Sequence, residues 1–357
     1  MEIKKNARPA FIRITLIIAG LVAALYATQW LNLKSFSQNQ KTNWTKAAFA
    51  ADDLSPTHNE VAVLKVPYPE EPTSPSNFLV GEELGIFKKH NIQLEYPGVI
   101  PSTQLVASVV SGYIDVGGAH FNRTIAGISA GAKILAVIAN SETTERFPHM
   151  IGVVKKGGKL RKPEDFVGKK IGLALNGGCH EYTPYAWLSK HGIKDPKHKV
   201  QVIILSRNAL EQAVRQGDLD LAMLHKMPEE INRKGEFDVI FSDYDVWGTD
   251  GGATPNYFSL EFIKNNPQVV KNFTAALAET INWSNANPYR AREITARRTN
   301  YDVNLINQRF YAPDGLIQPI TAEVWIDLLV EYGEIKPGIT LEQIYTNKFN
   351  PFYKEGL

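Results

Sequence analysis

Residues 102–122 read STQLVASVVSGYIDVGGAHFN, and in this stretch a helix, a strand and the start of a second helix follow one another. Apolar residues recur at helical spacing over 102–110, with a serine at the expected helix start. The apolar run 114–116 ends in two glycines, a pattern typical of a short buried strand before a sharp turn. A second helix is expected over 121–130. This order predicts a strand whose carboxyl end leads directly into a helix.

The same alternation extends along the chain in both directions. Short apolar or alternating runs predict strands at 61–66, 92–96, 133–139, 151–154, 170–174, 200–205, 219–223, 238–241 and 257–260. Helical spacing predicts helices at 78–89, 163–166, 182–189, 209–215, 267–286, 289–298 and 322–332. Alternating strands and helices predict an α/β fold with mostly parallel sheets flanked by helices and a helical C-terminal tail. Because the pattern restarts after Met150, it allows either two independent domains or two lobes.

The N-terminal residues predict export. Four basic residues within the first thirteen precede an apolar run at 14–30, which is the pattern of a signal peptide or a membrane anchor. Ala48-Phe49-Ala50 resembles a signal-peptidase site. We therefore assign 1–50 to a signal peptide or N-terminal membrane anchor and 51–60 to a linker. Either reading places the rest of the chain outside the cytoplasm, in the second case tethered by residues 14–30.

Charge and cysteine content exclude several classes of protein. The chain has 39 Lys and Arg against 37 Asp and Glu, and residues 1–50 hold seven of the basic residues and one acidic residue. The remainder therefore carries 32 against 36, a net charge of −4, which argues against nucleic acid as a partner. The single cysteine, Cys179, excludes an internal disulfide.

Five sequence pieces, taken in order, resemble the nitrate/sulfonate/taurine group of periplasmic binding proteins. They are FLVGEELGIFKKHNIQLEY (78–96), the stretch 102–122, PEDFVGKKIGLALNGG (163–178), AVRQGDLDLAML (213–224) and NKFNPFY (347–353). The resemblance implies a two-lobed periplasmic binding protein of type II with two hinge crossings. Lobe 1 would comprise 61–151 and 257–357, and lobe 2 would comprise 152–256. It also implies a monomer that delivers a small molecule to an ABC permease without a cofactor.

The expected ligand site lies where strands lead into helices, because free N–H groups at helix starts hold anions. The turn at 117–122 in the first lobe and the turn at 176–181 in the second meet this condition. The resemblance also places ligand contacts at the first of these turns. The candidate ligand-binding residues are Tyr68, Ser102, Thr103, Gln104, Gly118, Ala119, His120, Asn122, Asn176, Gly177, Gly178, His180, Glu181, Asn208 and His225. The expected solute is a small, anionic organic molecule such as a sulfonate or taurine, or a nitrate-like anion.

Three alternatives stay open at this point. His120, His180, Glu181 and His225 are residue types that bind transition metals, which would make the chain a metal receptor. An uncleaved segment at 14–30 would suit a membrane-anchored sensor. A fungal pyrimidine synthase shares the architecture, but that enzyme carries a cysteine-rich iron motif and this chain has one cysteine. No G-x-S-x-G, Walker or H-E-x-x-H motif is present, so we expect a binding protein rather than an enzyme.

Overall fold

The computed structural model describes residues 60–69, 72–249, 252 and 254–354. Residues 57–357 form one compact unit. The predicted signal peptide or anchor at 1–50 and nearly all of the predicted linker, residues 51–59, lie outside the described residues. Within the described ranges, no helix combines the length and the apolar composition that crossing a bilayer requires.

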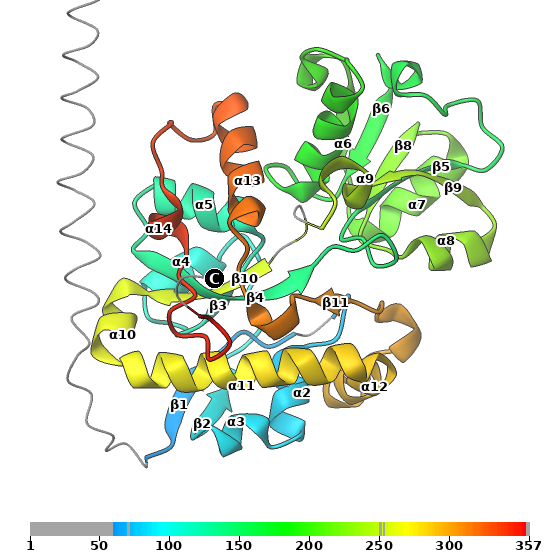
Figure 1. The fold of residues 1–357 in the computed structure, drawn as a ribbon. Coiled ribbons are helices and arrows are strands. Elements are labelled where there is room, and N and C mark those ends of the chain that lie inside the picture. Colours follow the sequence, from blue (N-terminus) through cyan, green and yellow to red (C-terminus); the bar gives the residue numbers. More distant parts are fainter. Residues whose placement is uncertain (1–59, 70–71, 250–251, 253, 355–357) are drawn as a thin grey trace, which may run out of the picture. The chain divides into compact units, whose positions relative to one another are not determined.

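The first lobe is built around a two-stranded sheet and a four-stranded sheet (Figure 1). In the smaller sheet β1 and β2 pair in parallel, and the larger sheet has the order β11-β4-β10-β3. The strands are β1 (Ala62–Lys65), β2 (Ile92–Glu95), β3 (Gly117–Gly118), β4 (Ile134–Glu142), β10 (Thr254–Ser259) and β11 (Phe310–Tyr311). The N–H groups of Asp115 and Val116 donate to Lys65 O, so the segment leading into β3 runs beside β1.

Helices from both ends of the chain pack on these sheets. They are α2 (Asn77–Glu83), α3 (Ile86–Lys89), α4 (Leu105–Val110), α5 (Phe121–Ser129), α10 (Leu260–Asn265), α11 (Pro267–Ala286), α12 (Pro288–Thr299), α13 (Pro319–Glu331) and α14 (Leu341–Ile344). Two 3₁₀ turns, η4 (Val303–Leu305) and η5 (Pro313–Gly315), lie between α12 and α13. The long helix α11 has the predicted bounds, and Pro267 occupies its first turn, where the missing N–H costs nothing.

The second lobe is a five-stranded sheet of order β7-β6-β8-β5-β9, drawn in green in Figure 1. Its strands are β5 (Ile151–Lys155), β6 (Lys170–Leu173), β7 (Gln201–Ile204), β8 (Leu221–Leu224) and β9 (Phe237–Ser242). Its helices are α6 (Cys179–Lys190), α7 (Arg207–Gln216), α8 (Pro228–Lys234) and α9 (Asp243–Trp247), with 3₁₀ turns η1 (Pro163–Phe166) and η2 (Pro196–His198). Helix α9 packs against α6.

The sheets are mixed rather than mostly parallel, which corrects the sequence prediction. Among the strands of the described residues, only β1 with β2, and β6 with β7 and β8, pair in parallel, whereas β10 is antiparallel to both β3 and β4. The reason for the antiparallel pairing is the path of the chain. Strand β10 returns from the second lobe and therefore runs through the first sheet in the direction opposite to β3 and β4. In the second lobe β5 lies antiparallel to β8 and β9 in the same way.

The crossings between the lobes lie a few residues earlier than expected. Ile151 already pairs with Leu224 and Ser242 in the second lobe, and Thr254 already pairs with Ser141 in the first. The chain therefore crosses over at 143–150 and returns after α9, before Thr254.

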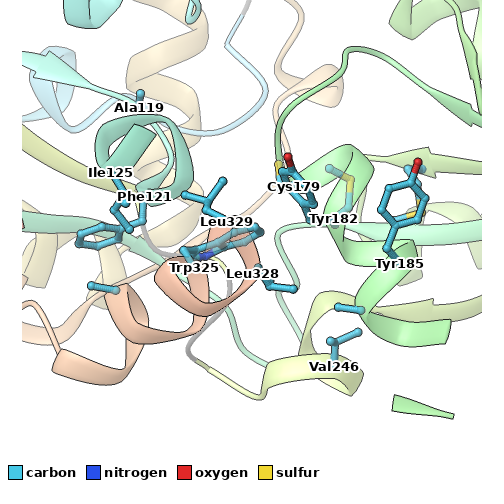
Figure 2. Close-up of a cluster of buried hydrophobic side chains, with 14 of the residues drawn as sticks. Ala119, Phe121, Ile125, Cys179, Tyr182, Tyr185, Val246, Trp325, Leu328 and Leu329 are labelled. Atoms are coloured by element: carbon cyan, nitrogen blue, oxygen red, sulfur yellow. The ribbon is translucent and has the colours of Figure 1, made fainter. Parts of the chain in front are cut away.

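One cluster of buried apolar residues includes side chains from both lobes (Figure 2). Helices α5 and α13 contribute from the first lobe, and α6 and α9 contribute from the second. The side chains labelled in Figure 2 are Ala119, Phe121, Ile125, Cys179, Tyr182, Tyr185, Val246, Trp325, Leu328 and Leu329. The lobes are thus joined by packed side chains as well as by the two crossings.

Candidate ligand site between the lobes

The beginnings of α5 and α6 lie against each other. Helix α5 follows β3 with His120 as its N-cap, and α6 follows β6 with Gly178 as its N-cap. Asn122 Nδ2 donates to Gly177 O at 3.2 Å. A Cβ atom placed on Gly178 would lie 3.5 Å from Arg123 Nη2. The turns at 117–122 and 176–181, which come from different lobes, therefore meet.

Four histidines and the only cysteine gather at this meeting point. Cys179 Sγ lies 3.4 Å from His149 Nε2 and 3.6 Å from His225 Nε2. The ring centroids of His180 and His225 are 4.5 Å apart, and those of His120 and His149 are 5.0 Å apart. His149 belongs to the first crossing, and His225 follows β8. We call His120, His149, Cys179, His180 and His225 the His–Cys cluster.

His149, His180 and His225 are neutral at pH 7, because the pKa of each is lowered. Burial, with the nearby charge of Arg207, lowers the pKa of His180 to about 3. Burial also lowers the pKa of His149, where the charges of His225 and Arg309 act in the same direction. The same cause lowers the pKa of His225. Neutral imidazoles accept as well as donate hydrogen bonds, so these rings suit a polar ligand or a metal.

The thiol of Cys179 is held in its protonated form. Burial, followed by the negative charge of Asp243, raises its pKa to about 12. An activated cysteine shows the opposite shift, because a neighbouring cation or a helix start stabilises its thiolate. Proximity to two histidines therefore does not make Cys179 a nucleophile.

Arg309 is a buried positive charge beside the cluster. Its side chain is 6% exposed, and Nη1 lies 3.4 Å from both Pro148 O and His149 Nδ1. Among the described residues no carboxylate lies within ion-pair distance of it, although the charge of Asp243 acts on it. A buried guanidinium is normally paired, so this position favours an anionic ligand.

Nine of the fifteen predicted site residues lie at the meeting point of the lobes or directly beside it, and the other six lie elsewhere. His120, Asn122, Gly178, His180 and His225 lie at the meeting point of the lobes, as described above. Gly118 and Ala119 precede His120 directly, with Gly118 facing Asn256 Nδ2 in β10. Asn176 and Gly177 form the outer part of the α6 turn, and Arg123 Nη2 donates to Asn176 O at 3.5 Å.

Glu181 points away from the His–Cys cluster. Its Oε2 accepts from the N–H of Gly177 at 2.7 Å, and its Oε1 accepts from Tyr185 OH at 3.4 Å. Both bonds hold the turn before α6. Glu181 also lines an outer hollow of about 540 Å³ together with Asn176, Gly177, Val202, Ile204 and Glu334. The structure therefore does not bring Glu181 to the cluster.

The remaining candidates also lie elsewhere. Tyr68 OH donates to Arg298 O at 3.0 Å, which ties Tyr68 to α12. Ser102, Thr103 and Gln104 are exposed, and Ser102 does not cap α4, whose N-cap is Gln104. Asn208 is an exposed residue in the first turn of α7, since Ser206 is that helix's N-cap. None of these contacts is with the cluster.

Sequence reasoning missed His149 and Arg309 as site residues and did not include Cys179 among the candidates. His149 and Arg309 stand in irregular segments with no motif around them, and only the topology brings them to α6. Lys226, which follows His225 in the chain, adds no free positive charge to the site. Its Nζ is 2.6 Å from Glu211 and 2.9 Å from Glu230, so that charge is neutralised locally.

Comparison with known proteins places this arrangement in context. The family model described as "NMT1/THI5 like" matches residues 73–291. No curated protein matches the chain in sequence.

Solved structures share the fold at low sequence identity. The alkanesulfonate-binding protein SsuA from Xanthomonas axonopodis pv. citri bound to MOPS is 16% identical with a TM-score of 0.61, over 81% of this chain and 100% of that one. The periplasmic aliphatic sulphonate binding protein SsuA from Escherichia coli is 14% identical with a TM-score of 0.64, over 79% and 91%. The periplasmic nitrate-binding protein NrtA from Synechocystis PCC 6803 is 13% identical with a TM-score of 0.61, over 81% and 87%. The predicted two-lobed periplasmic binding protein fold is confirmed.

Proposed function

The chain belongs to the NMT1/THI5-like family, and from this premise we propose that it is the extracytoplasmic solute-binding component of an ABC importer. It captures a small anionic organic molecule between its lobes and delivers it to a membrane permease. It acts as a monomer and captures the solute without a cofactor, either after cleavage of residues 1–50 or tethered through residues 14–30. The fold shared with sulfonate- and nitrate-binding proteins supports this function.

The single observation that carries the proposal is the meeting of the two helix beginnings beside Arg309. The first N–H groups of α5 and α6 have no partner inside their own helices and carry partial positive charge. Arg309 adds a full charge at the same place, in surroundings where burial strengthens electrostatic attraction. An anion held there would contact both lobes, so its binding would favour their closure about the crossings.

Binding fits this site better than covalent catalysis does. A cysteine nucleophile needs a base that accepts its proton, and the resulting thiolate–imidazolium pair needs stabilisation. Burial disfavours both charged forms here, as the raised pKa of Cys179 and the lowered pKa of His225 indicate. We therefore propose a receptor rather than an enzyme of the pyrimidine-synthase type.

Thermal unfolding with a panel of solutes tests this function. The panel contains alkanesulfonates, taurine and nitrate, with neutral pyrimidines as the uncharged comparison. A bound solute at a hundred times its Kd stabilises the folded chain by about 2.7 kcal/mol. We expect at least one anion to raise the unfolding temperature. Stabilisation by a neutral pyrimidine and by no anion would contradict the anionic solute.

Arg309→Gln provides the test at the site itself. Loss of a charge-assisted contact of about 1.5 to 3 kcal/mol should weaken binding of the active anion by about 10-fold to 150-fold. The matched control is Arg297→Gln, since Arg297 pairs with Glu83 on the surface of the first lobe and its side chain is 60% exposed. Isothermal titration calorimetry of both variants gives the ratio of their dissociation constants for the anion. Equal affinities would remove Arg309 from the site.

A further inference from the structure

We propose that Cys179, His180 and His225 together bind one divalent transition-metal ion of the zinc class. Thiolate sulfur and imidazole nitrogen are the ligands that zinc prefers, and three protein ligands with one open position form a common zinc arrangement. The three residues come from the start of α6 and the end of β8, both in the second lobe. The site stands independently of the anionic solute proposed above.

The distances between the ligand atoms carry this proposal. One ligand atom from each of Cys179, His180 and His225 lies within 4.8 Å of the others. Zinc bonds of about 2.3 Å to sulfur and about 2.05 Å to nitrogen place the two donors of a tetrahedral site roughly 3.6 Å apart. Cys179 Sγ and His225 Nε2 are already 3.6 Å apart. The separation of that pair already matches two donors of one tetrahedral ion, and a ring nitrogen of His180 lies within 4.8 Å of both.

His180 is a second, independent sign of a ligand at this place. Its side chain is 2% exposed, and neither ring nitrogen has a hydrogen-bond partner in the structure. Buried polar groups are rarely left in this state, because burial removes their bonds to water without replacing them. A metal bond to one nitrogen would satisfy a donor atom that the surrounding protein leaves without a partner.

The neighbouring histidines have other roles in this arrangement. Arg309 Nη1 faces His149 Nδ1, so neutral His149 carries its ring hydrogen on Nε2, the nitrogen that faces the sulfur. His149 therefore donates to Cys179 rather than binding the ion. His120 Nδ1 lies 3.1 Å from Asn122 Oδ1, the kind of contact that orients a ring toward a metal. His120 comes from the first lobe, and one of its ring nitrogens lies within 4.8 Å of ligand atoms of His149 and Cys179.

Some charged groups around the cluster oppose a bound cation, and others favour it. Arg123, Arg207 and Arg309 oppose a further positive charge. A bound ion displaces the proton of Cys179, and the thiolate then supplies one negative charge in direct contact. The carboxylate of Asp243 acts on the same sulfur. With a thiolate among the ligands and a carboxylate close by, the site suits a thiophilic ion and not a hard cation such as Ca²⁺ or Mg²⁺.

Cobalt titration of the tag-free full chain, stripped with chelator, tests the proposal. Co²⁺ replaces Zn²⁺ in tetrahedral sites and gives a near-ultraviolet charge-transfer band when a thiolate is bound. Because the chain has one cysteine, such a band can arise only from Cys179. We expect the band to saturate at one equivalent, together with intense visible bands of tetrahedral cobalt, and to disappear when Zn²⁺ is added. A titration without the thiolate band would overturn the proposal, whatever the behaviour of any variant.

Substitutions then separate the ligands from the other histidines. Cys179→Ser should abolish the charge-transfer band, and His180→Ala or His225→Ala should weaken Zn²⁺ binding at least tenfold in competition with a chromophoric chelator. His198→Ala is the matched control, since His198 is exposed and pairs with Asp195. Circular dichroism verifies that each variant folds. Unchanged Zn²⁺ affinity in both histidine variants would contradict the assignment. Anion binding measured with chelator present tests the solute proposal separately.

Discussion

At the scale of single residues, two glycines near the meeting helices have very different surroundings. A Cβ on Gly117 would lie 2.2 Å from Tyr257 Cε2, whereas the nearest atom to a Cβ on Gly178 is 3.4 Å away. Tyr257 is fully buried, so its ring cannot move aside without disturbing the core of the first lobe. Gly117 is therefore required for packing, and Gly178 is not.

Alanine at each position tests this difference. Gly117→Ala should lower the free energy of unfolding by about 1 to 3 kcal/mol, because overpacking forces shifts in the core. Gly178→Ala should change it by no more than about 0.5 kcal/mol, since its extended backbone suits any residue. Urea unfolding followed by tryptophan fluorescence gives both values. Equal destabilisation would show that the Tyr257 contact is not what excludes a side chain.

The candidate site could be predicted in part at this scale. His120, His180 and His225 follow strands at turn positions, and a residue's place in a strand-turn-helix unit can be read from its neighbours. The direction of a side chain cannot, as Glu181 shows by bonding to Gly177 within its own turn. Arg309 could not be predicted at all, because its proximity to His149 spans 160 residues and depends on the return of the chain.

At the scale of elements, an ion cluster centred on Glu211 fastens α7 to the turn after β8 and to α8. Glu211 is 13% exposed, and its carboxylate lies 2.6 Å from Lys226 Nζ and 3.2 Å from Lys234 Nζ. Burial alone would raise the pKa of Glu211, but the hydrogen bonds and charges of the two lysines outweigh it and lower that pKa. A lowered folded-state pKa means that the ionised form stabilises the lobe.

Glu211→Gln should therefore destabilise the chain in a pH-dependent way. At pH 7 we expect a loss of about 1.5 to 3 kcal/mol in the free energy of unfolding, the range for hydrogen bonds to charged groups. The stabilisation is complete above 4.5, the ordinary pKa of a glutamate, and is lost as pH falls below that value. The unfolding free energies of the variant and the natural chain should therefore converge in acid. Glu229→Gln is the control, because the Arg146–Glu229 pair is about two-thirds exposed on both sides. A difference that persists unchanged at low pH would contradict this role.

Element types were more predictable than their pairing. The periodicity of 267–286 gives α11 its bounds, because twenty residues of helical spacing leave little ambiguity. Short elements were harder, and α8 and α9 were missed since each is a single turn or two. The direction of β10 could not be inferred from its residues, because a strand of six apolar and polar residues carries no mark of its partners.

At the scale of the whole unit, aromatic side chains near the His–Cys cluster join the lobes. Trp325 of α13 lies with its ring centroid 4.7 Å from that of His120 and 5.0 Å from that of Trp247. His120 belongs to the same lobe as Trp325, whereas Trp247 ends α9 in the other. Tyr182 of α6 adds a contact at 6.4 Å to Trp325. Contacts between the lobes that involve no solute determine what fraction of the molecules is closed before the solute binds.

Trp247→Ala should therefore weaken solute binding without touching the solute. An aromatic pair contributes about 0.5 to 1.5 kcal/mol beyond its buried area, so the variant should lower the closed population and raise the apparent Kd by roughly twofold to twelvefold. Trp283→Ala is the matched control, since Trp283 packs on Val80, Ala291 and Ile294 inside the first lobe. That variant should lose stability and keep its affinity. Small-angle scattering of residues 57–357, which form one compact unit, should show a larger radius of gyration for Trp247→Ala than for Trp283→Ala in the absence of solute. If both variants kept the natural radius and affinity, the aromatic contact would not control closure, and the crossings alone would have to set the balance between open and closed lobes.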